Sequence, residues 1–138
     1  MEALQALINL SQAAAIAPAL IQGGGGNTSV KTGDTMLIKA SGFRLDEVSE
    51  QRGFVKVQYQ PVVDFLKRNT NTLQQPDAEL KQFVNEQIIG DKTFLPSMET
   101  GFHAVLKQYV IHTHPVVVNQ LLCCEGGEQR IRSNFKDE

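Results

Sequence analysis

Residues 109–115 read YVIHTHP, which places two of the chain's histidines at the end of an apolar run. An apolar run that favours a strand ends in His112 and His114, and a proline closes it. Alternate side chains of a strand share one face, so both imidazoles should point the same way, beside Val110. Two such imidazoles can bind one metal ion, although a His-x-His pair is also compatible with an ordinary polar strand end. The chain has only three histidines, so this placement is not casual.

The composition describes one ordinary domain. The chain has 138 residues, of which 41% are hydrophobic and 20% are charged. A chain of this size buries about two thirds of its unfolded surface without cross-links. The net charge of −2 provides no electrostatic basis for binding nucleic acid or an anionic membrane. We therefore expect a single domain over residues 1–138, with no nucleic-acid partner and no membrane partner.

The apolar-rich segment over residues 3–21 and the two cysteines bear on the cellular location of the protein. Polar residues interrupt it, and it lacks the basic start of a signal peptide, so it predicts neither a membrane span nor a leader. Cys123 and Cys124 are neighbours without C-x-x-C spacing, and a disulfide between them would be strained. We expect two reduced thiols and a cytoplasmic location.

Hydrophobic periodicity and turn residues predict the secondary structure. Helices are expected at residues 2–21, 61–68, 76–89, 97–107 and 115–122, and strands at 28–31, 35–39, 54–59 and 109–114, with a hairpin turn at 32–34. Residues 69–76 are predicted to form a loop, and residues 125–138 to be only weakly helical. Strands 54–59 and 109–114 should share one sheet. This mixture indicates α/β layers, without the regular alternation of a doubly wound parallel sheet.

Two small-residue turns could bind an anion. Residues 23–29 read GGGGNTS, where freed backbone N–H groups and the amide of Asn27 are possible donors. This pattern is neither a Walker A loop nor a dinucleotide fingerprint, and a flexible connector is the alternative. Residues 39–42 read KASG and offer a hydroxyl, a glycine N–H and a nearby cation, with a plain turn as the alternative.

A third motif, PSME at residues 96–99, precedes a predicted helix. Ser97 is expected as the N-cap or in the first turn, where an anion is favoured. Glu99 is either a capping carboxylate or a functional group. His103 follows at i+4 on the same helical face, and we expect it to be packed and hydrogen-bonded.

Together these motifs resemble the class II aldolase/adducin family, which includes fuculose and rhamnulose phosphate aldolases and ribulose phosphate 4-epimerase. The matching segments are GNTS at residues 26–29, KASG at 39–42, PSME at 96–99 and HTHP at 112–115. Their order and rough separations are similar to those of the family, and the resemblance covers residues 4–122. The sequence of residues 21–31 is most similar to the aldolase part of bifunctional aldolase/short-chain dehydrogenase proteins.

The resemblance implies a three-layer α/β/α fold around a largely antiparallel sheet, a divalent metal, usually Zn2+, and a sugar-phosphate substrate. It also implies a homo-oligomer. By the same resemblance, His112 and His114 are metal ligands, and Glu99 is the catalytic acid/base that can also bind the metal. The residues implied for the phosphate pocket are Gly26, Asn27, Ser41, Gly42 and Ser97.

Some features depart from the family pattern. No histidine follows His114, whereas the family's aldolases use a third histidine on a later strand. Met98 stands where the family often has a second serine. We therefore expect an N-terminal portion of the family domain, lacking its C-terminal part, that cleaves sugar phosphates slowly or not at all by itself. A sugar-phosphate epimerase or dehydratase, and a non-catalytic adducin-like interaction module, are the alternatives.

Overall fold

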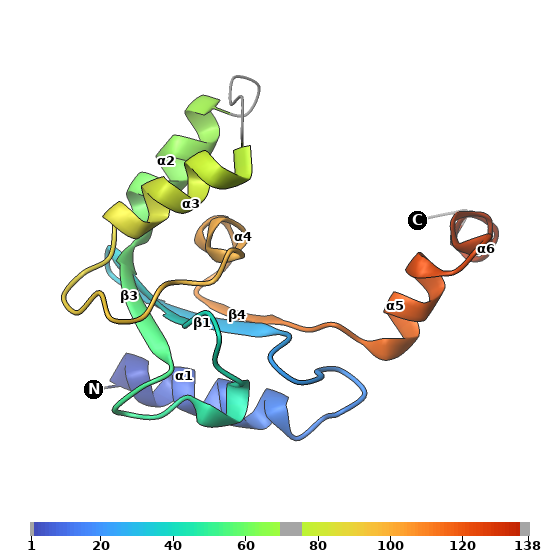
Figure 1. The fold of residues 1–138 in the computed structure, drawn as a ribbon, viewed down its shortest axis with the longest axis horizontal. Helices are drawn as coiled ribbons and strands as arrows, with labels where there is room; N and C mark the ends of the chain where they lie inside the picture. Colours follow the sequence, from blue (N-terminus) through green and yellow to red (C-terminus); the bar gives the residue numbers. More distant parts are fainter. Residues whose placement is uncertain (1, 70–75, 136–138) are drawn as a thin grey trace.

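The computed structural model describes residues 2–69 and 76–135. Within them the chain forms a four-stranded antiparallel sheet of order β3-β2-β1-β4 with helices on both faces (Figure 1). The strands are β1 (Asn27–Thr32), β2 (Thr35–Lys39), β3 (Phe54–Gln58) and β4 (Tyr109–His112). The helices are α1 (Glu2–Ala15), α2 (Tyr59–Asn69), α3 (Pro76–Glu86), α4 (Thr100–Val105), α5 (Val116–Cys123) and α6 (Gly127–Asn134), with a short 3-10 turn η1 (Leu45–Glu47). The predicted α/β fold class is confirmed.

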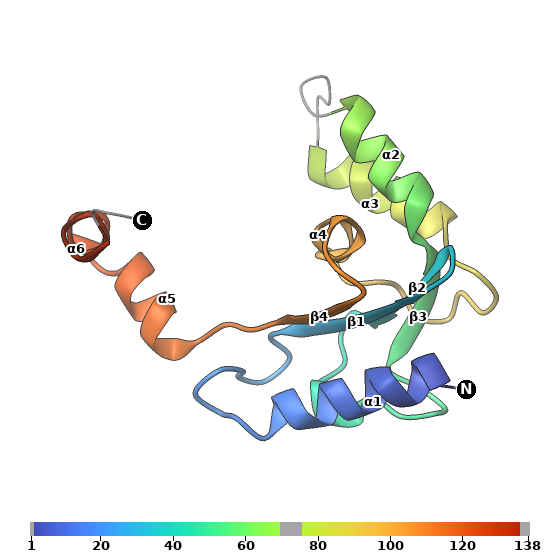
Figure 2. The ribbon, with the colours of Figure 1, turned by 180° about the vertical axis from the view of Figure 1, so that it is seen from behind.

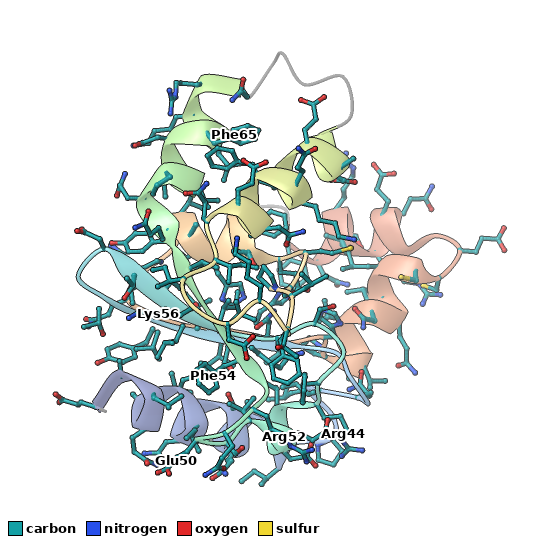
Figure 3. All side chains as sticks on the ribbon, turned by 60° about the vertical axis from the view of Figure 1, so that its left-hand side comes forward. Arg44, Glu50, Arg52, Phe54, Lys56 and Phe65 are labelled. Atoms are coloured by element: carbon teal, nitrogen blue, oxygen red, sulfur yellow. The ribbon has the colours of Figure 1, made fainter. Side chains whose placement is uncertain are left out.

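The sheet separates two apolar cores. Helix α1 covers one face, while α2, α3 and α4 cover the other, as Figures 1 and 2 show from opposite sides. The larger core lies on the α2–α4 side and contains Met36, Ile38, Ala40, Val55, Val57, Val62, Val63, Val84, Ile88 and Ala104. The smaller core lies under α1 and contains Leu7, Ile8, Val30 and Val48. Figure 3 shows Phe54 on the α1 side and Phe65 on the upper helices, where its ring stacks on Phe83 with 4.4 Å between centroids.

The central strand β1 is buried although most of its side chains are polar. Because side chains alternate along a strand, Asn27, Ser29 and Lys31 face α4, whereas Thr28 and Val30 face α1. Asn27, Thr28 and Ser29 have no exposed surface, and Lys31 is 6% exposed. Buried polar groups of this kind require partners, and most of these partners come from the helices above and below the strand.

The predicted hairpin is confirmed, and the strands predicted at 54–59 and 109–114 do lie in one sheet. Both are shorter than predicted, since β3 ends at Gln58 and β4 at His112, which leaves His114 beyond the strand. Gly33 makes the hairpin turn with φ +55°, a conformation that glycine adopts without steric penalty. The predicted helix over 2–21 was too long, since α1 ends at Ala15. Pro18 explains this end, because its ring would collide with the carbonyl of the preceding helical turn. Residues 70–75 of the predicted loop lie outside the described residues.

The C-terminal region differs most from the prediction. Residues 127–134 form helix α6, although the charged tail was expected to be only weakly helical. Helices α5 and α6 contact each other and extend away from the sheet beyond β4 (Figures 1 and 2). This pairing gives α6 a neighbour that its own sequence does not reveal. None of the helices in the described part of the chain has the length and apolar character needed to cross a membrane.

Candidate metal centre

The two histidines of the HTHP motif are held at one end of the sheet by different neighbours. His112 is the last residue of β4 and pairs with Asn27 on the central strand. His114 lies beyond the strand, where its N–H donates to the Leu20 carbonyl over 2.8 Å. The N–H of Val116 donates to the Ala19 carbonyl over 2.9 Å. The segment that follows α1 therefore guides the chain past the end of β4.

The glycine loop packs closely against these histidines. Gly26 has φ +73°, and a Cβ atom there would lie 3.0 Å from the His112 carbonyl oxygen. A Cβ atom on Gly25 would lie 3.3 Å from His114 Nδ1. Both positions favour glycine because the backbone must approach the histidine segment closely. The loop is therefore part of the wall of the site and not only a connector.

Glu99 is aimed by a tight turn before α4. The Glu99 N–H donates to Ser97 Oγ over 3.2 Å, and the Thr100 hydroxyl donates to the Ser97 carbonyl over 2.6 Å. Glu99 is the N-cap residue of α4, and the helix begins at Thr100. The predicted helix over 97–107 was thus too long at both ends, and Ser97 precedes the helix instead of capping it directly.

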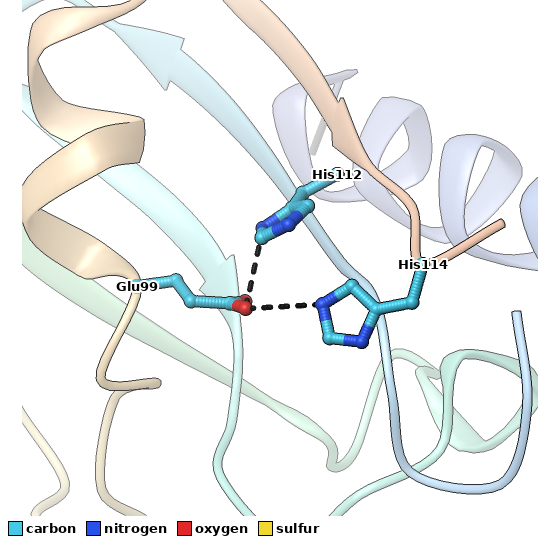
Figure 4. Close-up of side chains that lie close together, drawn as sticks. All are labelled: Glu99, His112 and His114. Carbon is cyan, nitrogen blue, oxygen red and sulfur yellow. Dashed lines mark ion pairs between the residues drawn. The ribbon is translucent and has the colours of Figure 1, made fainter. Parts of the chain in front are cut away.

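Glu99, His112 and His114 converge on one point (Figure 4). Glu99 Oε1 lies 3.2 Å from His112 Nδ1 and 3.5 Å from His114 Nε2. One ligand atom from each residue can be chosen so that all lie within 4.8 Å of one another. The side chains are 24%, 36% and 40% exposed, respectively, so the site is reachable from solvent. Two imidazole nitrogens and one carboxylate form a donor set that suits a catalytic zinc ion with an open coordination position.

His103 lies behind this site and is not one of the converging groups. It is completely buried, and its Nδ1 atom is 2.7 Å from Ser29 Oγ, which confirms the expected hydrogen-bonded packing. Its ring centroid lies 6.2 Å from that of His112. The pKa of His103 is lowered to about 4, mainly by burial. The charge of Glu99 opposes this shift, and the charges of His112 and Lys31 add to it. The ring is therefore neutral at neutral pH.

Two buried polar atoms near His112 lack a partner within the described residues. They are the Nε2 atom of His103 and the Nδ2 atom of Asn27. The carbonyl oxygen of the Asn27 side chain is used, since it accepts a hydrogen bond from the Thr28 N–H over 2.8 Å. The unpaired amide of Asn27 is a donor on the strand residue that pairs with His112. A donor in this position is suited to an acceptor atom of a bound molecule.

The KASG turn reaches the same end of the sheet. The Ser41 N–H donates to the Leu95 carbonyl over 2.8 Å, and Ala40 forms a bridge with Pro96. The turn is thus attached to the segment that leads into Ser97. This attachment arises because β2 ends where β1 begins and β4 ends, as the antiparallel registers require.

The cavity beside Glu99 is only partly the predicted pocket. A largely apolar cavity of about 390 Å³ lies between α3 and the PSME segment, and Ser97 and Glu99 form part of its wall. The other residues predicted for phosphate binding, which are Gly26, Asn27, Ser41 and Gly42, are not part of that wall. The structure therefore brings the predicted residues to one end of the sheet, and of the five predicted for the phosphate it is Ser97 that lines this cavity.

Two further residues near the site received no site role from the sequence. Ser29 is the hydrogen-bond partner of His103, and nothing in the local sequence distinguishes it from other strand serines. Lys39 is 3% exposed, although the sequence analysis treated it only as a nearby cation. Burial lowers the pKa of Lys39, whereas the carboxylates of Glu99 and Glu47 raise it. A lysine directly before a small-residue turn was the available signal.

The family described as Class II Aldolase and Adducin N-terminal domain matches residues 5–136, and the chain belongs to this family. Class II aldolase domains typically depend on a divalent metal, and Glu99, His112 and His114 form a possible metal site.

Two similar proteins support the assignment. The chain is 32% identical over 116 residues to the "Uncharacterized oxidoreductase YuxG" of Bacillus subtilis (strain 168), which covers 77% of this chain and 16% of that protein. The chain thus matches a small part of a much longer relative. The name of that relative, an oxidoreductase, fits a bifunctional arrangement of the longer protein. The solved N-terminal class II aldolase domain of a conserved protein from Thermoplasma acidophilum has a TM-score of 0.71 and 23% identity, covering 92% of this chain and 62% of that chain. It shows the shared fold.

Proposed function

We propose that this chain is a metal-dependent sugar-phosphate aldolase domain, a carbon–carbon lyase that acts on a ketose phosphate. The observation that carries this proposal is the convergence of Glu99, His112 and His114 in a member of the class II aldolase family. We assign Zn2+ to these three ligands because two imidazoles and one carboxylate match its preferred donors. The proposed domain comprises residues 1–138.

In the proposed reaction, Glu99 and the two histidines would have different roles. A bound zinc ion would supply Lewis-acid stabilisation of the negative charge that develops on the ketone oxygen. The Glu99 carboxylate is 24% exposed and adjacent to both histidines, so it can exchange a proton with a substrate hydroxyl. Its second oxygen accepts a weak hydrogen bond from the Ser97 hydroxyl at 3.5 Å, which restrains the carboxylate. His112 and His114 hold their positions through β4 and the Leu20 contact.

The phosphate would bind to the neighbouring donors. We assign it to Gly26, Asn27, Ser41, Gly42 and Ser97. The buried and unpaired Nδ2 atom of Asn27 supports this assignment, because a phosphate oxygen would satisfy it. Binding energy from the phosphate, remote from the reacting carbons, would then hold the carbon chain beside Glu99.

We further propose that the protein acts in the cytoplasm as a homo-oligomer. Cys123 and Cys124 are both free and exposed, which suits a reducing compartment. Helix α5 exposes Val117, Val118 and Leu122, which are apolar side chains that a second subunit would cover.

Zinc binding and cleavage together test the function. The chain and its Glu99→Gln variant are equilibrated with zinc and assayed for cleavage of fuculose and rhamnulose phosphates. Glu125→Gln, which changes an exposed acid of the α5–α6 connection, is the matched control. We expect about one zinc per chain and slow, zinc-dependent cleavage that is lost in Glu99→Gln and retained in Glu125→Gln. Equal cleavage by all three proteins would contradict the role of Glu99.

A second candidate function is a non-catalytic interaction module of the adducin type. It is favoured by the position of His103, the remaining one of the three histidines. This residue is hydrogen-bonded to Ser29 and does not join the converging ligands. The assay above separates the two candidates. Zinc binding with every ketose phosphate left intact, together with stable self-association, would favour the module.

A further inference from the structure

Helix α4 carries Glu99 at its N-terminus but is too short to hold a fixed position by itself. It has six residues, and isolated helices shorter than about 12 residues are marginal in water. The N–H of His103 in this helix donates to the Glu99 carbonyl over 3.1 Å, so Glu99 moves with α4. The position of the carboxylate therefore depends on the contacts that hold α4 against the rest of the chain.

The C-terminal end of α4 is held by the buried side chain of Lys31. Only 6% of this residue is exposed, and its ammonium group donates to the carbonyls of His103, Leu106 and Lys107 over 2.6, 2.7 and 2.9 Å. The last carbonyls of a helix have no partner within the helix, so a side-chain donor is needed there. A positive charge at this end also interacts favourably with the helix dipole. The ammonium group lies 5.2 Å from the centre of the Tyr59 ring, which adds a cation–π contact.

Strand β1 connects this clamp to the histidines of the metal centre. Lys31 lies near one end of the strand, and Asn27 at the other end pairs with His112 on β4. Ser29, between them, contacts α4 through its hydroxyl group. One strand therefore supports both α4, which carries Glu99, and β4, which carries His112. The distance between the carboxylate and the imidazole depends on where α4 is fixed along β1.

We propose that Lys31 is a positioning residue that fixes α4 along β1 and thereby holds Glu99 at the distance from His112 and His114 that a shared metal ion requires. The inference rests on the function proposed above and deepens it, because it assigns the geometry of the metal centre to a residue outside it. The carbonyls that Lys31 holds begin four residues beyond Glu99, which is about 6 Å along a helix. Lys31 therefore acts through α4 and not by contact with the reacting atoms.

The ordinary alternative is that Lys31 only stabilises the fold, and the other face of β1 offers a matched control. Ser11 on α1 is completely buried, and its hydroxyl lies 2.6 Å from that of Thr28 and donates to the Leu7 carbonyl over 2.8 Å. Thr28 faces α1, whereas Lys31 faces α4. Ser11→Ala therefore removes buried hydrogen bonds beside the same strand and lowers stability without altering the support of α4.

The experiment measures the zinc affinity of the full chain by competition with a chromophoric chelator, under conditions where urea titration shows each protein to be folded. The proteins compared are the unmodified chain, Lys31→Met, Lys31→Arg and Ser11→Ala. We expect Lys31→Met to weaken zinc binding about tenfold, the lower end of the range for loss of a group that supports metal ligands. Lys31→Arg should restore most of the affinity, because a guanidinium also donates to several carbonyls. Ser11→Ala should bind zinc like the unmodified chain.

Hydrogen exchange of the metal-free proteins provides a readout that does not depend on zinc. The amides of α4, and that of His103 in particular, should exchange faster in Lys31→Met than in the unmodified chain, because the helix opens locally more often. The amides of α1 should be affected less. Ser11→Ala should show the reverse, with faster exchange in α1 and little change in α4.

The outcomes separate this inference from the function on which it rests. Equal zinc affinity in Lys31→Met and Ser11→Ala, or unchanged exchange in α4 of Lys31→Met, would overturn the inference and leave the metal centre standing. No zinc binding by the unmodified chain would overturn the proposed function and this inference with it. If Lys31→Met does not fold, Lys31→Gln carries the test, because its amide keeps a donor for the carbonyls but removes the charge.

Discussion

Acid should destabilise this fold through His103. In the folded chain burial lowers the pKa of this histidine to about 4, whereas its ordinary value is 6.5. Between these pH values the unfolded chain binds a proton that the folded chain does not, so stability falls as the pH falls. Each pH unit in this window is worth about 1.4 kcal/mol, which gives a total loss of about 3 kcal/mol by pH 4. Below pH 4 this histidine contributes no further change.

The His103→Phe variant isolates this effect. Phenylalanine keeps a buried ring of similar size but cannot titrate, and the groups that face it, Glu99, His112 and Lys31, remain. The variant loses the Ser29 hydrogen bond, which lowers stability by a constant amount of about 1–3 kcal/mol at every pH. The stability advantage of the unmodified chain over the variant should therefore shrink as the pH falls from 6.5 to 4, and it should vanish or reverse by pH 4, because the loss of about 3 kcal/mol equals or exceeds the constant deficit.

The assay is urea unfolding followed by circular dichroism at several pH values between 4 and 8. A chelator keeps metal binding to the neighbouring ligands out of the measurement. Curves of stability against pH that stay parallel for the two proteins down to pH 4 would refute the reasoning. That result would mean that His103 is protonated in the folded chain or is not buried in solution.

Other predictions concern the backbone and the buried cation. Gly26→Ala should lower the free energy of unfolding by about 1–2 kcal/mol and also weaken zinc binding, because the new Cβ would meet the His112 carbonyl at 3.0 Å in a left-handed conformation. Gly23→Ala, with φ +53° but nothing within 4 Å, should cost less stability and leave zinc affinity unchanged, and equal zinc affinity in the two variants would count against the packed loop. Lys31→Met should destabilise the chain by about 2 kcal/mol in urea, since three buried or partly buried carbonyls lose a charged donor. Unchanged stability would show that water replaces the ammonium group.

Some elements followed from local sequence because their causes are local. The hairpin was predictable because Gly33 supplies the turn between alternating strands. The apolar alternation before His112 was enough to predict that this residue lies on a strand and shares a face with Val110. The end of α1 was signalled by Pro18, but periodicity alone extended the helix past it. Family resemblance, rather than any single motif, indicated which residues belong to one site.

Other features depended on contacts between distant segments. Glu99 meets His112 and His114 because β1 lies between β2 and β4. This strand order brings segments that are far apart in sequence to the same end of the sheet. His103 is neutral because Ser29, 74 residues earlier in the chain, and the surrounding core enclose it.

The sequence by itself therefore determined the residue types of the site, the hairpin and the periodic strands and helices, since these depend on neighbours along the chain. Only the tertiary structure decided that α6 forms against α5, that His114 is held by Leu20, and that Lys39 is buried behind its turn. Burial and pairing arise when separate segments exclude water from one another, and a local pattern does not contain that information.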